Sequence, residues 1–174
     1  MNLFILDEDP VRAAQGLDDK RVGKLLMEAC QMLSTGAHSA SSSAVEVGVG
    51  YACRPSYQGH PVTLWVGATR GNWLWAARHA QGLADEYLFR YGRHHASADR
   101  LPYILTLSSC IPDGPLLPFQ NSARNAGLSL DYSSLPVVEA YRSYIQERWR
   151  TDTRAVTFRN RGIPKWAAGS VPCE

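Results

Sequence analysis

Lysine, arginine and glutamate side chains recur at helical spacing near the start of the chain. Lys20, Lys24, Glu28 and Gln31 fall within about 80° of one another at about 100° per residue, with Arg21 beside them. This order stabilises a helix poorly, because Lys20 and Lys24 are like charges at i,i+4 and Lys24 precedes Glu28. An ordinary solvated face is one interpretation. The other is an anion site in which the lysines hold phosphate and Glu28 acts as acid, base or charge stabiliser.

Three further groups are candidates for the same chemistry. Asp7 and Asp9 lie a short turn upstream of the stripe, and we expect both carboxylates to reach it as catalytic groups. His60 is the next candidate, because a neutral imidazole can serve as acid or base near pH 7.

A second polar face is predicted on a helix over residues 73–91. Trp75, His79, Glu86 and Arg90, together with Gly82, lie opposite the apolar stripe of that helix. We interpret Trp75 as a stacking platform for a base and the others as polar contacts to substrate. The alternative is that Trp75 contacts a second layer of the structure.

Basic residues gather in the last third of the chain. Residues 142–165 hold seven basic and two acidic side chains, a net +5, so the remainder of this +2 chain is −3. Arginine interleaved with aromatic residues suits phosphate contacts and stacking, which favours double-stranded DNA as the partner over a merely solvated basic tail. The predicted DNA-binding residues are Arg148, Arg150, Arg154, Arg159, Arg161, Lys165 and Trp166.

The elements that position these groups are mostly helical. Capping residues, prolines and apolar periodicity predict helices over 10–16, 18–34, 61–65, 73–91 and 134–149. Residues 36–58 are predicted to be a flexible loop and residues 101–128 a proline-rich connector. We therefore expect a mostly α fold, a single compact helical domain over residues 1–174 with long irregular loops.

Composition excludes several classes of protein. The chain has 174 residues, 45% hydrophobic and 20% charged, and no apolar run approaches the ~20 residues that a membrane span needs. Acidic residues follow directly after Leu6, so no signal peptide is expected and we predict a cytoplasmic protein, in a bacterial host cell if it is phage-encoded. The four cysteines form no C-x-x-C and the histidines are scattered, so we expect neither metal nor cofactor.

Several motifs resemble one known family. Leu17-Asp18, Lys20-Arg21, Gly23-Lys24, Glu28 and Gln31-Met32-Leu33 resemble the motif L-D-x-x-R-L-G-K-x-x-x-E-x-x-Q-I-L of pyrimidine dimer DNA glycosylases, the endonuclease V-like family. His60-Pro61 with Trp65 is similar to their H-P-x-x-x-W element, and Asp85-Glu86-Tyr87 with Arg90 and Gly92 resembles their next acidic helix. The likeness covers about residues 3–93, and the opening also resembles small proteins of DNA phages. Asp18, Gln31 and Trp65 belong to these motifs, and we expect them to contact substrate.

The resemblance implies a mostly α fold and metal-free chemistry on a pyrimidine lesion in duplex DNA. In the endonuclease V type, an N-terminal amine attacks C1′, a glutamate assists, and the resulting imine permits β-elimination. This chain departs from that pattern, because it opens Met1-Asn2 and asparagine is usually too large for methionine removal. Lys20 or Lys24 is an alternative nucleophile, but a lysine must be desolvated to be neutral at pH 7.

Two other functions fit the same residues. One is a phage DNA hypermodification transferase, in which a free amino acid or amine replaces the pyrophosphate of 5-(pyrophosphoryloxymethyl)uracil in DNA. The cations would then neutralise the leaving pyrophosphate, and a carboxylate would orient or deprotonate the amine. The other is a non-catalytic DNA-binding protein that uses only its basic C-terminal segment.

Overall fold

The structure, a computed structural model, describes residues 1–41 and 43–170. This part of the chain contains six α-helices and one short hairpin of two strands, so the predicted mostly α fold is confirmed. The helices are α1 (Pro10–Gln15), α2 (Asp19–Ala40), α3 (Pro61–Ala68), α4 (Arg70–Tyr91), α5 (Leu101–Thr106) and α6 (Val137–Thr151). The antiparallel strands are β1 (Arg124–Asn125) and β2 (Leu130–Asp131).

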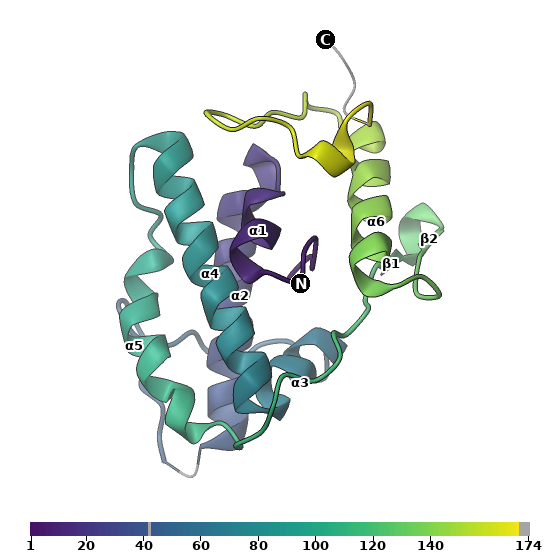
Figure 1. Ribbon diagram of the computed structural model, residues 1–174. Helices are drawn as coiled ribbons and strands as arrows, with labels where there is room; N and C mark the ends of the chain where they lie inside the picture. Colours follow the sequence, from purple (N-terminus) through teal and green to yellow (C-terminus); the bar gives the residue numbers. More distant parts are fainter. Residues whose placement is uncertain (42, 171–174) are drawn as a thin grey trace.

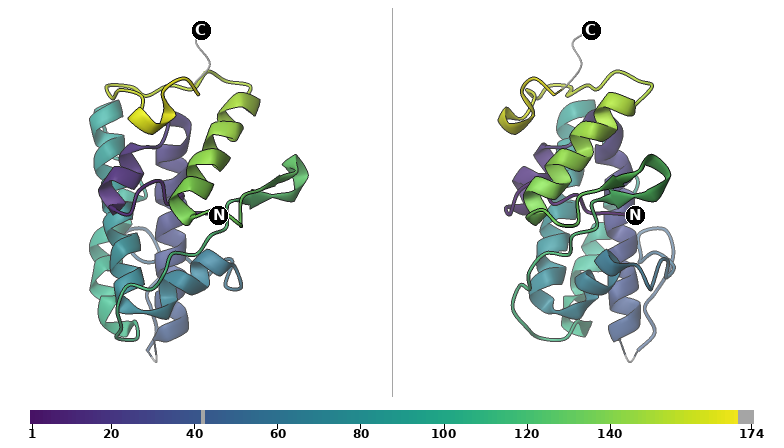
Figure 2. Two further views of the ribbon diagram at one scale, coloured as in Figure 1. Left: turned by 45° about the vertical axis from the view of Figure 1, so that its right-hand side comes forward. Right: turned by 90° about the vertical axis from the view of Figure 1, so that its right-hand side faces the viewer.

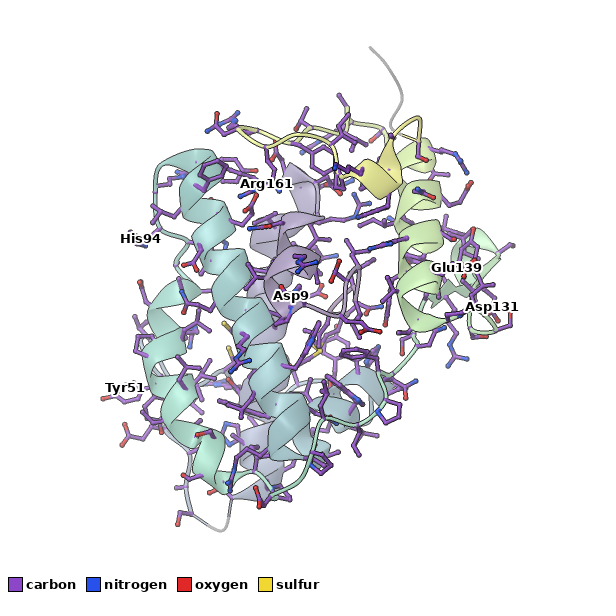
Figure 3. The ribbon with its side chains drawn as sticks, in the orientation of Figure 1. Asp9, Tyr51, His94, Asp131, Glu139 and Arg161 are labelled. Atoms are coloured by element: carbon purple, nitrogen blue, oxygen red, sulfur yellow. The ribbon has the colours of Figure 1, made fainter. Side chains whose placement is uncertain are left out.

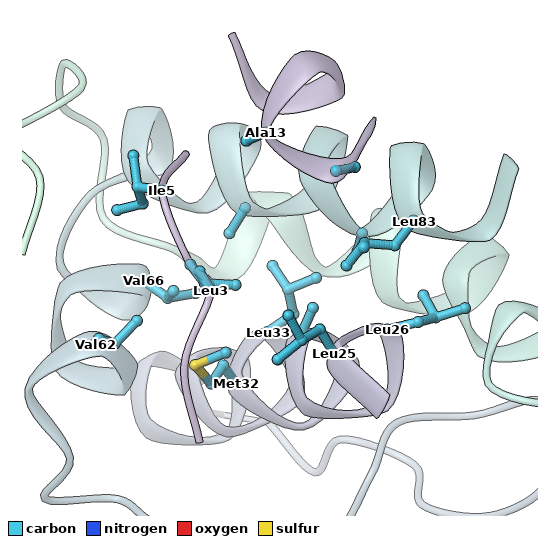
Figure 4. Packing of buried hydrophobic residues seen from close by; sticks show 14 of the residues in the cluster. Leu3, Ile5, Ala13, Leu25, Leu26, Met32, Leu33, Val62, Val66 and Leu83 are labelled. Atoms are coloured by element: carbon cyan, nitrogen blue, oxygen red, sulfur yellow. The ribbon is translucent and has the colours of Figure 1, made fainter. Parts of the chain in front are cut away.

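The two longest helices, α2 and α4, lie side by side and form the centre of the molecule (Figure 1). The predicted apolar arc of α2 is buried, and it packs against α3, α4 and the N-terminal segment (Figure 4). The arc consists of Val22, Leu25, Leu26, Ala29, Met32 and Leu33. Burial of such side chains contributes about 1.5–3 kcal/mol each for the larger ones, so this arc fixes which face of α2 turns outward.

α2 continues beyond its predicted end and occupies the first residues of the predicted loop 36–58. Ser34 and Thr35 are buried inside the helix because their hydroxyls donate to the carbonyls of Cys30 and Gln31, each at 2.7 Å. Serine and threonine hydroxyls can donate to carbonyls of the preceding helical turn in this way. Their polar groups are then satisfied inside the helix, and the helix continues past them.

The predicted connector 101–128 also contains more regular structure than its prolines indicated. Pro102 stands in the first turn of α5, where its missing N–H costs no hydrogen bond. Strand β1 lies near the end of the same segment. The β1–β2 hairpin projects from the helical bundle beside α6, and its base lies near the N-terminus (Figure 2).

The second polar face of α4 is buried under α1, so its prediction as a base-stacking platform is wrong. The indole of Trp75 donates to the carbonyl of Glu8 at 2.7 Å, and Nδ1 of His79 lies 2.9 Å from the carbonyl of Pro10. The two rings stack with centroids 5.3 Å apart. A Cβ at Gly82 would stand 3.2 Å from the Ala14 Cβ, so glycine permits this close approach of α1.

Glu86 and Arg90 belong to a buried ion-pair network rather than to a substrate surface. Arg90 Nε lies 2.7 Å from Glu86 Oε1, and Arg90 Nη1 lies 2.9 Å from Asp19 Oδ1. Arg161, from the C-terminal segment that crosses this end of the bundle, reaches the same Glu86 oxygen at 2.5 Å (Figure 3). Buried charges need such partners, so these groups connect α2, α4 and the C-terminal segment.

Within the described residues, no helix combines the length and the apolar character that crossing a membrane requires.

Candidate functional site

A cavity of about 340 Å³, called here the N-terminal cavity, lies where the start of the chain, α2, the β1–β2 hairpin and α6 meet. Its lining includes four catalytic candidates from the α2 stripe, together with His60. The lining residues are Met1, Asn2, Phe4, Lys20, Arg21, Lys24, Leu25, Glu28, His60, Ser122, Arg124, Asn125, Tyr144 and Arg148.

Glu28 faces the first residues of the chain in this cavity. Its Oε2 accepts a hydrogen bond from the backbone N–H of Asn2 at 2.8 Å and lies 3.7 Å from the Met1 ammonium. Its Oε1 lies 3.5 Å from Lys24 Nζ. Glu28 is only 8% exposed, so this residue is not part of a solvated helix face. The arrangement places a carboxylate within reach of an α-amine.

The N-terminal segment is fixed by its own side chains. The Asn2 side-chain oxygen accepts from the N–H of Leu3 and Phe4, and its amide donates to the Ser122 carbonyl at 3.3 Å. Phe4 has φ +51°, a left-handed conformation that costs energy for a residue with a side chain. Its ring packs against Tyr141 and Tyr144 of α6, with both centroid distances 5.8 Å. The surroundings therefore hold a strained backbone that aims the amine at Glu28.

Two cations beside Glu28 are already paired. Arg21 contacts Asp18 at 2.6 Å and Asp152 at 2.8 Å, while Lys20 contacts Asp152 at 2.6 Å. Burial opposes ionisation of Asp152, but Lys20 and Arg21 outweigh it and lower the pKa of that carboxyl. Asp18 is buried and also accepts from the Trp149 indole at 2.6 Å, so its contacts are internal.

The lysines of the stripe lack the burial that a lysine nucleophile requires. The Lys20 side chain is 50% exposed and the Lys24 side chain 67% exposed, and each ammonium faces a carboxylate. Each side chain is therefore open to solvent, whereas a lysine nucleophile needs a desolvated site. The Met1 side chain is 2% exposed, and the α-amine beside it lies 3.7 Å from Glu28 Oε2.

His60 contributes a neutral ring to the cavity. Burial, and next the positive N-terminus, lower the pKa of His60, while Glu28 opposes them. His60 Nδ1 accepts the N–H of Val62 at 3.2 Å at the start of α3, so the ring proton of the neutral form lies on Nε2.

Four other candidates lie outside the cavity, for identifiable reasons. Asp9 caps α1 by accepting from the N–H of Val11 and Arg12, and Asp7 lies 3.6 Å from Arg142 of α6. Gln31 lines a separate hollow beside residues 47–56, and the Trp65 indole donates to the Pro118 carbonyl at 2.8 Å. The expectation that Asp7 and Asp9 reach the stripe is wrong, because Asp9 caps α1 and Asp7 lies beside Arg142 of α6.

The fold divides the basic residues of the segment 142–165, and among those that the structure describes only Arg148 lines the N-terminal cavity. Arg150 pairs with Glu147 at 2.7 Å, and Arg159 lies over the Tyr91 ring. Trp166 stacks on Trp149 at 5.8 Å, while Arg154 and Lys165 are exposed. Trp166 and Arg161 therefore have structural contacts, and DNA binding by the exposed members stays a prediction.

Sequence reasoning missed the part of the cavity that comes from residues 122–144. Ser122, Arg124 and Asn125 lie in or beside strand β1, and Tyr144 lies one helical turn before Arg148 on α6. The available signal was Gly127 between short polar segments, which is typical of a turn. Among the described residues, no group of three His, Cys, Asp or Glu side chains is placed to hold a metal ion.

Comparison with known proteins agrees with the motifs on α2 and α3. Residues 1–99 of the 174 match the family model described as pyrimidine dimer DNA glycosylase. No curated protein and no solved structure matches the chain. The matched segment contains the start of the chain, Glu28 and His60, and the chain therefore belongs to the pyrimidine dimer DNA glycosylase family.

Proposed function

We propose that this protein is a DNA glycosylase that excises a pyrimidine dimer from duplex DNA, with the Met1 α-amine as nucleophile and Glu28 as its base. The observation that carries this proposal is the buried Glu28 carboxylate, 2.8 Å from the Asn2 nitrogen and 3.7 Å from the Met1 ammonium. Membership of the family supports DNA as the substrate.

The chemistry follows from these positions. The neutral amine forms a bond to C1′ of the altered nucleotide, and the glycosidic bond breaks with its electron pair leaving on the base, which takes up a proton. Glu28 accepts the proton that the amine loses. Opening of the sugar ring, with a proton delivered to its oxygen, then gives an imine. Water can hydrolyse the imine, or β-elimination can break the strand at C3′.

The remaining cavity groups have supporting roles in this proposal. Lys20, Arg21 and Lys24 hold the carboxylates of Asp152 and Glu28 in place, because each cation faces one of them. The neutral His60 ring can donate its Nε2 proton to the leaving base, because its Nδ1 is occupied by the Val62 N–H.

Mass spectrometry of nucleosides and strands tests the reaction class. Three duplexes are compared: one with a cyclobutane pyrimidine dimer, one with 5-hydroxymethyluracil, and one with its pyrophosphorylated form plus an amino-acid mixture. We expect glycosidic-bond cleavage or strand cleavage on the dimer duplex alone. A mass gain confined to the pyrophosphorylated duplex would establish a transferase instead. Tight, salt-sensitive binding without change in any duplex would establish a non-catalytic DNA-binding protein.

A further inference from the structure

Lysine and arginine side chains that line the N-terminal cavity differ in whether a carboxylate already neutralises them. Lys20 and Arg21 share Asp152, and Lys24 faces Glu28. A DNA phosphate that took over one of these cations would have to compete with an existing ion pair. The free energy gained from such a contact is reduced by the pair that it disturbs.

Arg124 and Arg148 are the exceptions among the cavity's described lining. Neither has a carboxylate within 4.0 Å in the part of the chain that the structure describes. Nε of Arg148 is buried and has no hydrogen-bond partner there, which is costly for a guanidinium unless a ligand supplies an acceptor. Arg124 is exposed, and its charge reaches into the cavity, where it helps to lower the pKa of His60.

Both arginines are held by elements anchored to the start of the chain. Tyr141 of α6 accepts the N–H of Ser122 at 3.1 Å, and Ser122 in turn accepts the Asn2 side chain. At the hairpin base, the Asn121 amide donates to the carbonyls of Tyr132 and Leu135. The hairpin and α6 lie beside the N-terminus in both views of Figure 2. The backbone segments that carry the two arginines are thus fixed to the start of the chain before any ligand arrives.

We propose that Arg124 and Arg148 together bind a backbone phosphate of the DNA beside the nucleotide that occupies the N-terminal cavity. This inference rests on the proposed function, which supplies DNA as the substrate. It assigns phosphate binding to two residues outside the segment 1–99 that matches the family. A planar guanidinium presents paired donors that match phosphate oxygens, so two unpaired arginines at one cavity form a phosphate clamp. The clamp places C1′ against the amine.

The test measures binding of the full chain to a duplex with a tetrahydrofuran abasic-site analogue, between about 50 and 200 mM salt. We expect Arg124→Gln and Arg148→Gln each to weaken binding about tenfold and to reduce the slope of log K against log salt by about 0.9. Arg78→Gln is the matched control, because exposed Arg78 on α4 does not line the cavity. It should leave affinity within about twofold. Arg124→Lys and Arg148→Lys should keep the slope, because the charge remains.

The results distinguish this inference from the proposed glycosylase. Binding to the analogue needs no turnover, so lost affinity in both glutamine variants supports the clamp even if the protein cleaves no duplex. Wild-type affinity and slope in either folded glutamine variant would overturn it, with folding checked by thermal unfolding. A pyrophosphate titration identifies the phosphate source. Pyrophosphate binding that both glutamine variants abolish, with DNA binding unchanged, would overturn the DNA assignment in favour of a small anion.

Discussion

Replacing Glu28 by glutamine is expected to lower the rate of base excision by about 10³-fold, with DNA affinity within about threefold of the unsubstituted protein. Glutamine keeps the size of the side chain and an oxygen that can accept the Asn2 N–H, now 2.8 Å from Glu28. It removes the negative charge that, in the proposed mechanism, takes a proton from the amine and stabilises the cation formed at C1′. The measurement is single-turnover cleavage of a dimer-containing duplex.

Glu139→Gln is the matched control, because Glu139 is exposed on α6 and does not line the N-terminal cavity. It should cleave at the unsubstituted rate. If Glu28→Gln retained more than a tenth of the single-turnover rate while folded, Glu28 would not be the base. A parallel loss of DNA affinity would instead show that Glu28 maintains the structure of the DNA-binding surface.

Acid is expected to destabilise the protein through His79, by about 3 kcal/mol between pH 7.5 and pH 4. Complete burial lowers the pKa of His79 to about 4, although its hydrogen bond to the Pro10 carbonyl opposes the shift. Since histidine in the unfolded chain titrates near 6.5, the folded protein binds fewer protons below that pH. The contribution to the free energy of unfolding is therefore full above about pH 6.5 and lost as the pH falls to about 4.

Urea unfolding across this pH range measures the effect, with His79→Phe as the test and His94→Phe as the control. His79→Phe loses the contact with Pro10 and starts less stable at pH 7.5, but its free energy of unfolding should decline less with acid. His94 is exposed, so its variant should follow the unsubstituted curve. Parallel curves for His79→Phe and the unsubstituted protein would show that His79 is protonated without cost.

The α2 stripe could be predicted from sequence because the helical period alone determines which residues share a face. Burial of Leu25, Leu26 and Leu33 turns Lys24 and Glu28 to the opposite side, where the structure places them at the cavity. The helical period does not show which other segments of the chain pack over that face. The N-terminal segment and α6 approach from far along the chain, and they convert an apparently solvated stripe into a partly buried site.

The same limit explains the wrong interpretation of α4. Trp75 and His79 are polar enough for a solvated face, but each is also able to bond a backbone carbonyl when buried. The carbonyls of Glu8 and Pro10 satisfy them, and these come from a segment whose approach depends on small residues at Gly82 and Ala14. Helical periodicity cannot distinguish a face that meets solvent from one that meets a second layer.

The hairpin was missed because its strands are only two residues long and carry no alternating pattern. Its position depends on distant partners, in particular Tyr141 of α6 and Asn2 at the start of the chain. Local sequence signals therefore predict the candidate carboxylate Glu28 better than they predict the residues that complete the cavity around it.

Reduction with borohydride during turnover tests most directly whether an α-amine held by Glu28 is the nucleophile. The imine between protein and deoxyribose becomes a stable amine on reduction, and mass spectrometry of the digested protein locates it. We predict an adduct on the α-amine of the N-terminal peptide, formed with the dimer duplex and absent in Glu28→Gln. An adduct on Lys20 or Lys24, or base release without any adduct, would contradict the mechanism.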